Sequence, residues 1–202
     1  ADHLTDGSFS SPYTLVMADE FQDTSIVRGK MLQALTRSPG SRLFVVGDDW
    51  QAINRFAGAD ISLMNDFEAN FGPNTTVKLT NTFRCPQKIS DLAASFVSKN
   101  PSQIEKSVKA TNPRTEESVL CYAVGENRDV ASLVEQHIRQ LHQKAEPQRS
   151  SRKSVMILGR YWSDKPRDLA KWHDAFKDKL NITFSTVHAA KGLEPDYVFL
   201  VN

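Results

Sequence analysis

The sequence has little of three features that would narrow its function at once. Only two of the 202 residues are cysteine, Cys85 and Cys121, too few for a disulfide framework or a zinc site. No apolar run approaches the roughly 20 residues that a membrane-spanning helix needs. The net charge is only +1, so composition alone does not indicate the basic surface typical of nucleic-acid binders. We therefore expect a cytoplasmic protein with reduced thiols and no membrane segment.

Short apolar runs alternate along the chain with helical patterns, in a composition that is 40% hydrophobic and 24% charged. Such runs are typical of parallel strands covered on both faces. The predicted strands are 13–18, 42–46, 77–80, 119–124, 155–158, 182–186 and 197–201. This alternation predicts an α/β fold class with parallel sheets, in one or two domains.

The intervening segments carry apolar side chains at helical spacing, which predicts helices with one buried face. Ser25 or Thr24 can cap the first of them, and Pro86 and Pro166 suit the start of two others. The expected buried sets are Val27, Met31 and Leu35; Ile89, Leu92, Ala93 and Phe96; Val130, Leu133, Val134, Ile138 and Leu141; and Leu169, Trp172 and Phe176. The break at 72–75 predicts a domain junction near residue 75, and the polar stretch 145–153 predicts a flexible surface loop.

Two carboxylates, Asp19 and Glu20, follow the first predicted strand directly. Ligands of open α/β sheets bind beyond the carboxyl ends of the strands. A first carboxylate there can hold Mg²⁺ through water, and a second can orient and deprotonate an attacking water. The alternative is an ordinary turn in which Asp23 or Thr24 caps the next helix.

The second predicted strand also ends in carboxylates, within the stretch 45–60 (VVGDDWQAINRFAGAD). Gln51 is an uncharged donor and acceptor that can sense a γ-phosphate. Asn54 and Phe56 can face a nucleic-acid strand, where stacking of a base on an aromatic ring contributes about 1–3 kcal/mol. The alternative is that the aromatic residues Trp50 and Phe56 belong to the core.

Two further segments place polar residues beside predicted strands. In 79–84 (LTNTFR), Arg84 lies at a strand–helix junction, from which an arginine can reach a phosphate. In 184–198 (FSTVHAAKGLEPDYV), a strand leads into a turn of small residues with His188 and Glu194. Taken singly, each has a structural alternative: a surface salt bridge for Arg84, and a hydrogen-bonded structural role for His188.

Together and in this order, the four segments resemble motifs II, III, IV and V of superfamily 1 helicases of the UvrD/Rep/PcrA family. The strings DEFQD at 19–23 and TVHAAKGLE at 186–194 are highly specific, and the likeness extends from residue 16 to residue 201. The resemblance implies RecA-like parallel sheets. Residues 1–75 would be the C-terminal part of a first RecA-like domain, and 76–202 a second, truncated before its final motif. It also implies ATP and Mg²⁺ as cofactors, and single-stranded DNA and duplex junctions as partners.

The resemblance further implies roles for single residues. Asp19 would hold Mg²⁺, and Glu20 would be the general base. Gln51 would couple the γ-phosphate to DNA, and Arg84 would contact the γ-phosphate from the second domain. ATP contacts are implied for Phe83, where the family usually has a tyrosine that stacks on adenine, and for Gly192 and Glu194. Contacts with single-stranded DNA are implied for Asn54, Phe56, Arg160, Thr186 and His188.

The sequence departs from the family at several points. It contains no Gly-Lys-Thr/Ser phosphate loop and no final arginine motif. Asn54 occupies a position where the family commonly has a tyrosine, and Ala57 one where related members often have an arginine. We therefore expect an internal fragment of a bacterial 3′→5′ DNA helicase that is inactive by itself. The alternatives are a subunit of a helicase–nuclease and a non-hydrolysing interaction module without the phosphate loop.

Overall fold

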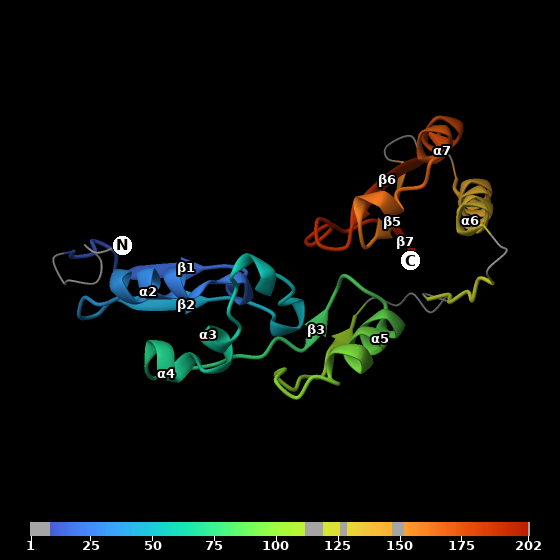
Figure 1. Ribbon diagram of the computed structural model, residues 1–202. Coiled ribbons are helices and arrows are strands. Elements are labelled where there is room, and N and C mark those ends of the chain that lie inside the picture. Colours follow the sequence, from blue (N-terminus) through green and yellow to red (C-terminus); the bar gives the residue numbers. More distant parts are fainter. Residues whose placement is uncertain (1–8, 112–118, 126–128, 147–151, 202) are drawn as a thin grey trace. The chain divides into compact units, whose positions relative to one another are not determined.

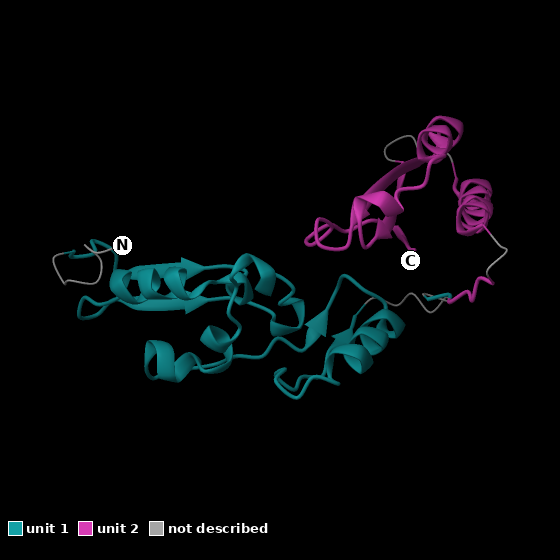
Figure 2. Cartoon of the chain, viewed as in Figure 1, with its two compact units in different colours: residues 1–120 teal, residues 121–202 magenta. Residues whose placement is uncertain are grey.

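The computed structural model describes residues 9–111, 119–125, 129–146 and 152–201. They form two compact units, residues 1–120 and 121–202 (Figure 2). Each unit combines helices with small parallel sheets (Figure 1), a mixed α/β arrangement that is compatible with a RecA-like helicase fold. The junction near residue 75 stays a prediction from the sequence.

The first unit begins with a parallel strand–helix–strand arrangement. Strand β1 (Leu15–Ala18) pairs in parallel with β2 (Arg42–Val45). Helix α2 (Ile26–Leu35) connects them and begins after Ser25, whose hydroxyl accepts a hydrogen bond from the Arg28 N–H. The expected cap is therefore confirmed, as are both strands in slightly shorter form.

The buried side of α2 differs from the predicted one. Val27 is 71% exposed and Met31 42% exposed. Gly29, Leu32 and Ala34 are buried instead. The helix is rotated toward Leu63, whose side chain lies so close that a Cβ on Gly29 would be 3.1 Å from it. The face of the helix that carries Gly29, Leu32 and Ala34 therefore packs inside the first unit, and the face with Val27 and Met31 does not.

A small cluster centred on Phe21 forms the core of this region. Phe21 lies in a 3₁₀ turn (Phe21–Asp23) and packs with Leu32 and Leu63. The rings of Phe67 and Phe71 meet it edge-on, with centroid distances of 5.8 and 5.7 Å. The short helices that carry these contacts are α3 (Ser62–Asn65) and α4 (Phe67–Phe71), and further 3₁₀ turns cover Asp49–Gln51 and Arg55–Ala57.

The rest of the first unit is built on two very short strands. β3 (Asn81–Thr82) pairs in parallel with β4 (Lys109–Ala110), beside helix α5 (Gln87–Val97). The strand predicted at 77–80 is wrong: pairing begins only at Asn81, and the side chains of Val77 and Leu79 are 78% and 79% exposed.

The prediction that one face of α5 is buried is also wrong: the first unit, to which α5 belongs, does not cover this face. None of the residues of α5 is buried, and Leu92 and Phe96 are 53% and 74% exposed. A ladder of two residues offers too little surface to cover an eleven-residue helix. The helix itself forms where the spacing placed it, with Pro86 at its N-cap.

The second unit contains a three-stranded parallel sheet in the order β6-β5-β7. β5 (Lys153–Gly159) lies between β6 (Leu180–Thr186) and β7 (Tyr197–Leu200). Helices α6 (Val130–Lys144) and α7 (Leu169–Phe176) supply the covering side chains, and a 3₁₀ turn spans Trp162–Asp164. The three strands and both helices were predicted from the sequence.

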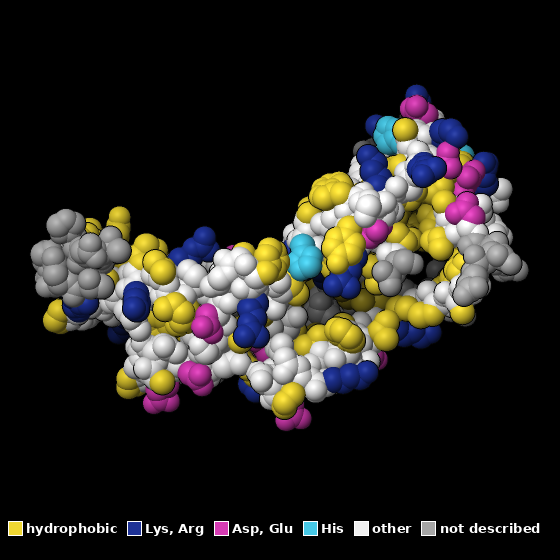
Figure 3. All heavy atoms as spheres, viewed as in Figure 1, with side chains coloured by type: hydrophobic (Ala, Val, Ile, Leu, Met, Phe, Trp, Pro, Cys, Tyr) yellow, Lys and Arg dark blue, Asp and Glu magenta, His cyan; other side chains and the backbone are white. Residues whose placement is uncertain are grey.

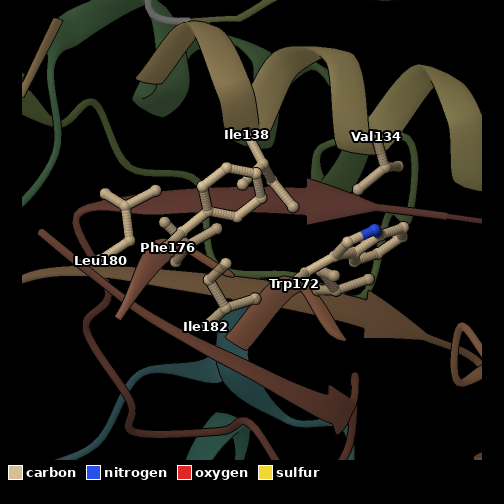
Figure 4. Close-up of a cluster of buried hydrophobic side chains, with 8 residues drawn as sticks. Val134, Ile138, Trp172, Phe176, Leu180 and Ile182 are labelled. Carbon is tan, nitrogen blue, oxygen red and sulfur yellow. The ribbon is translucent and has the colours of Figure 1, made fainter. Parts of the chain in front are cut away.

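The core of this unit lies between the sheet and these two helices. Figure 4 shows Val134 and Ile138 of α6 with Trp172 and Phe176 of α7, next to Leu180 and Ile182 of β6. Ile138 and Leu180 are fully buried. The apolar stripes predicted for these helices are therefore confirmed.

Two other predictions concern the segments before this core. Residues 119–124 form no strand: no backbone hydrogen bond in the described part of the chain pairs them with a neighbour. Apolar character alone does not make a strand without a ladder partner, and Tyr122 stacks on His137 instead, at 4.7 Å. Most of the predicted loop 145–153 lies outside the described residues, and its last residue begins β5.

The surface carries many hydrophobic side chains, drawn in yellow in Figure 3.

Both cysteines are free thiols. Among the described helices, none is long and apolar enough to cross a membrane.

Candidate functional site

The first two motif segments come together at one edge of the β1–β2 sheet. Because the strands are parallel, their carboxyl ends coincide: the Val46 N–H donates to Ala18 O, and the Phe21 N–H donates to Val46 O, both at 2.9 Å. Asp19 and Glu20 follow β1, and the loop at 47–51 follows β2 at the same edge. The two carboxylates and the loop that carries Gln51 therefore lie at the same edge of the sheet.

Glu20 has an unusual backbone conformation. Its φ of 49° and ψ of 43° lie in the left-handed region, and among the described residues no other non-glycine residue has a positive φ. This conformation costs a residue with a Cβ about 1–2 kcal/mol. The Glu20 N–H donates to Asp19 Oδ1 at 2.8 Å, and Glu20 O accepts from the Asp23 N–H at 2.9 Å. The exposed carboxylates of Asp19 and Glu20 are thus set on a tight, locally strained turn.

Gln22 connects this turn to the neighbouring loop. Its side chain is completely buried. Its Nε2 donates to Glu20 Oε2 at 2.5 Å, and its Oε1 accepts from the Asp48 N–H at 2.9 Å. Gln22 is not among the residues predicted from the sequence, although its place two residues after Glu20 indicates that it lies at the same turn.

Asp48 organises the loop that carries Gln51. Its Oδ2 accepts from Gln51 Nε2 at 2.8 Å, and its Oδ1 accepts from the Trp50 N–H and from Lys106 Nζ. Burial by itself raises the pKa of Asp48, but the hydrogen bonds from Lys106 and Gln51 and the charge of Lys106 outweigh it. The net pKa lies below the ordinary value. Asp48 is therefore a firmly ionised anchor for Gln51.

Asp49 ties the same loop to a distant part of the first unit. Its carboxylate is 1% exposed, and it accepts from the Ile104 N–H at 2.6 Å and from Lys106 Nζ at 2.7 Å. Trp50 adds an indole N–H bond to Ile104 O at 3.2 Å, and Lys106 Nζ lies 4.7 Å from its ring centroid. Removing one partner of a buried ion pair typically costs 3–5 kcal/mol. Sequence reasoning missed Lys106, because it is 57 residues from Asp49 and belongs to no motif.

The residues predicted to meet DNA in the first unit lie just beyond this loop. Asn54 Nδ2 donates to Asp23 Oδ1 at 3.0 Å, so Asn54 is joined to the turn after Glu20. Phe56 lies in the 3₁₀ turn Arg55–Ala57 and is 77% exposed. The alternative that Phe56 belongs to the core is therefore wrong, and Trp50 is partly buried.

Phe83 and Arg84 follow β3 directly. Phe83 is 78% exposed, Arg84 is also exposed, and the Arg84 N–H donates to Thr82 Oγ1 at 3.4 Å. Their predicted roles toward adenine and the γ-phosphate stay predictions.

The remaining predicted residues gather in the second unit, at the carboxyl ends of its strands. Gly159 of β5 pairs with Thr186 of β6, and the Val187 N–H donates to Gly159 O at 3.0 Å. Arg160 follows β5 directly, with its guanidinium 5.3 Å from the Tyr161 ring centroid, and His188 follows β6. The sheet therefore brings Arg160 and the start of the 186–194 segment to one edge.

The turn after β6 is held by Thr186. Thr186 is 9% exposed; its Oγ1 accepts from the Ala189 N–H at 3.2 Å, and its carbonyl accepts from the Ala190 N–H at 2.9 Å. Gly192 has a φ of 83°, a conformation that glycine adopts without steric cost. Glu194 is exposed two residues later. Thr186 thus shapes the segment that exposes His188 and Glu194.

The donor set can be compared with the requirements of Mg²⁺. Among the described residues there is no group of three or more His, Cys, Asp or Glu side chains that could hold a metal ion by itself. Mg²⁺ usually keeps several waters and takes only one or two carboxylates, with substrate phosphates as further ligands. The exposed carboxylate of Asp19, at a strand end, fits that mode of binding.

Comparisons with known proteins show that this chain is similar to DNA helicases. Residues 3–72 match the model of the UvrD/REP helicase N-terminal domain. The chain is 36% identical over 201 residues to DNA helicase IV of Escherichia coli (strain K12), an alignment that covers 98% of this chain and 28% of that protein. It is also 30% identical over 137 residues to ATP-dependent DNA helicase UvrD1 of Mycobacterium tuberculosis (strain ATCC 25618 / H37Rv), covering 65% of this chain and 18% of that protein.

The chain thus spans less than a third of the length of these relatives. The domain match falls on the segments that carry Asp19, Glu20 and Gln51, and the alignment with DNA helicase IV includes nearly the whole chain. Together, the family match and these relatives show that this chain is similar to part of a UvrD-like helicase.

Proposed function

We propose that the protein containing this chain is an ATP-dependent DNA helicase that couples ATP hydrolysis to 3′→5′ movement on single-stranded DNA and to unwinding at duplex junctions. One observation carries the proposal: the carboxylate of Glu20 is connected through Gln22 and Asp48 to Gln51, at the carboxyl ends of two parallel strands. Nucleotide hydrolysis needs a residue that orients the attacking water and groups that contact the γ-phosphate, and these hydrogen bonds join one candidate for each.

In this proposal the first unit supplies the hydrolytic groups. Glu20 accepts the proton of the attacking water, and Gln51 contacts the γ-phosphate. Asp19 would hold Mg²⁺, and the ion would supply positive charge that neutralises the phosphates. Arg84 brings positive charge to the γ-phosphate. The remaining ATP contacts are assigned to Phe83, Gly192 and Glu194.

Exposed residues of both units supply the contacts with DNA. Phe56 is exposed enough to stack on a base, and Asn54 stands beside the turn that carries the general base. Arg160 and His188 lie at one sheet edge of the second unit, both just beyond the Gly159–Thr186 pair. Thr186, for which the resemblance implies a contact with DNA, is only 9% exposed, and its hydroxyl holds the turn that carries His188. The two RecA-like domains of this proposal are 1–75 and 76–202.

The test uses the full-length protein that contains this chain. ATP hydrolysis is measured with and without single-stranded DNA for the wild type, Glu20→Gln and the control Glu68→Gln, which changes an exposed glutamate on α4. We expect DNA-stimulated hydrolysis that Glu20→Gln abolishes while nucleotide binding persists, and no effect of Glu68→Gln. Unwinding should require a 3′ single-stranded tail. Hydrolysis that survives Glu20→Gln would refute the proposal.

The 202-residue chain should itself show no hydrolysis, because its sequence lacks the Gly-Lys-Thr/Ser loop that cradles the phosphates. A phosphate-release assay on the purified chain checks this, and turnover that disappears in Glu20→Gln would contradict it.

A further inference from the structure

Gln22 is buried without being apolar. Its side chain has no exposed surface, although it carries one acceptor and two donors. Buried polar groups are almost always hydrogen-bonded. Here the amide orientation is set by its neighbours: a carboxylate oxygen of Glu20 can only accept from Nε2, and the N–H of Asp48 can only donate to Oε1. The residue is therefore a bridge between two segments that are 26 residues apart in sequence.

The bridge ends on the carboxylate of Glu20, which lies on a strained turn of the backbone. A left-handed non-glycine residue persists only where its surroundings hold it in place. The backbone around Glu20 is fixed by the bond from the Phe21 N–H to Val46 O, but the bond from Gln22 is what directs the carboxylate itself. Loss of the amide would leave the backbone turn in place and release the side chain.

The loop at Gly47 is shaped to admit the amide. A Cβ on Gly47 would lie 2.9 Å from Gln22 Oε1 and 3.2 Å from the Gln22 backbone nitrogen, so a larger residue would displace the bridge. Asp48 then continues the path, since its Oδ2 holds Gln51 Nε2 at 2.8 Å. An unbroken series of hydrogen bonds thus runs from Gln51 through Asp48 and Gln22 to Glu20.

We propose that Gln22 is a positioning residue that aims the carboxylate of Glu20 and couples it to the loop carrying Gln51. This inference rests on the proposed function, in which Glu20 is the base and Gln51 contacts the γ-phosphate. A shift of the 47–51 loop when the phosphate binds would pass through the Asp48 N–H to the amide, and from the amide to the base. Gln22 does not itself touch the substrate.

The experiment compares Gln22→Met with wild type in the full-length protein. Methionine is similar in size but makes neither hydrogen bond. We expect kcat for ATP to fall by about 10²-fold, a loss that a misplacement of about 1 Å can cause, while KM changes less than twofold. The matched control is Gln33→Met on α2, which loses a bond from Gln33 Nε2 to Asn70 O far from the turn and should keep normal kcat.

A double-mutant cycle separates positioning from simple support of the fold. Aspartate at position 20 is too short to reach the amide, so Gln22→Met should change kcat less than about threefold in a Glu20→Asp background. An equal loss in both backgrounds would overturn the inference. Gly47→Ala provides a second test if Gln22→Met does not fold, because it displaces the amide while keeping its chemistry. It too should lower kcat without raising KM.

The outcomes distinguish this inference from the proposed function. If Glu20→Gln leaves hydrolysis intact, the proposed function fails. If Glu20→Gln abolishes hydrolysis but folded Gln22→Met and Gly47→Ala retain full kcat, the function stands and the positioning role of Gln22 is refuted.

Discussion

Replacement of Asp196 by asparagine should destabilise the second unit at neutral pH. Asp196 joins the start of β7 to the start of β5. Its Oδ2 accepts from the Ser154 N–H and hydroxyl, both at 2.8 Å, and its Oδ1 accepts from Lys153 Nζ at 2.9 Å. Burial by itself raises the pKa of Asp196, but these hydrogen bonds and the charge of Lys153 more than offset it and lower the pKa to about 2.

The size of the effect follows from this pKa. A decrease from the ordinary 3.8 to about 2 corresponds to roughly 2 kcal/mol of extra stability for the ionised form. The side chain is 31% exposed, so solvent screening reduces this to about 1 kcal/mol. Because the pKa is lowered in the folded state, the contribution is complete above pH ~4 and disappears as the pH falls through about 2.

Urea unfolding followed by tryptophan fluorescence measures this difference. With Trp50→Phe in all proteins compared, the remaining fluorophores, Trp162 and Trp172, both report on the second unit. Asp168→Asn is the matched control, since its ion pair with Lys171 is exposed and contributes little. Equal stability of wild type and Asp196→Asn at pH 7, or a difference that persists undiminished at pH 2, would refute the reasoning.

Three further predictions concern other parts of the chain. In the full-length protein, Arg84→Ala should lower the maximal DNA-stimulated ATPase rate at least ~10³-fold, by analogy with arginine fingers, and Arg84→Lys should restore little of it. Steady-state kinetics with saturating DNA check this, and a near-normal rate would favour a surface salt bridge. Ile138→Ala should cost about 2–5 kcal/mol of unfolding free energy, because Ile138 is fully buried in the second core. Gly159→Ala should cost about 1–3 kcal/mol, because its Cβ would lie 2.6 Å from Asp164 Cβ. Urea titration measures both losses, and a change below 0.5 kcal/mol (about the scatter of neutral surface substitutions) would contradict either one.

The fold was most predictable where an apolar sequence pattern also has a neighbouring element to pack against. The apolar runs of β5, β6 and β7 pair with one another in one sheet. The apolar stripe on α6 packs against this sheet through Val134 and Ile138. The pattern failed at residues 119–124 and at α5. Residues 119–124 have no ladder partner among the described residues, and within the first unit α5 lies against the short strand β4. Periodicity identifies an apolar face but not what covers it.

The candidate site was predictable in its chemistry and not in its connections. Asp19, Glu20 and Gln51 follow from their places after strands, because parallel strands end at one edge. The role of Lys106 depends on a contact across 57 residues, which no local signal encodes. Gln22 was visible in the motif, but its burial was not, since glutamine is usually exposed.

The left-handed backbone at Glu20 sets folding and chemistry against each other at a single position. Glycine adopts this conformation without steric cost, so Glu20→Gly would relieve roughly 1 kcal/mol of backbone strain, but it would also leave the buried Nε2 of Gln22 without the carboxylate to which it donates. Glutamate at this place is what a sequence retains when it is selected for more than its fold.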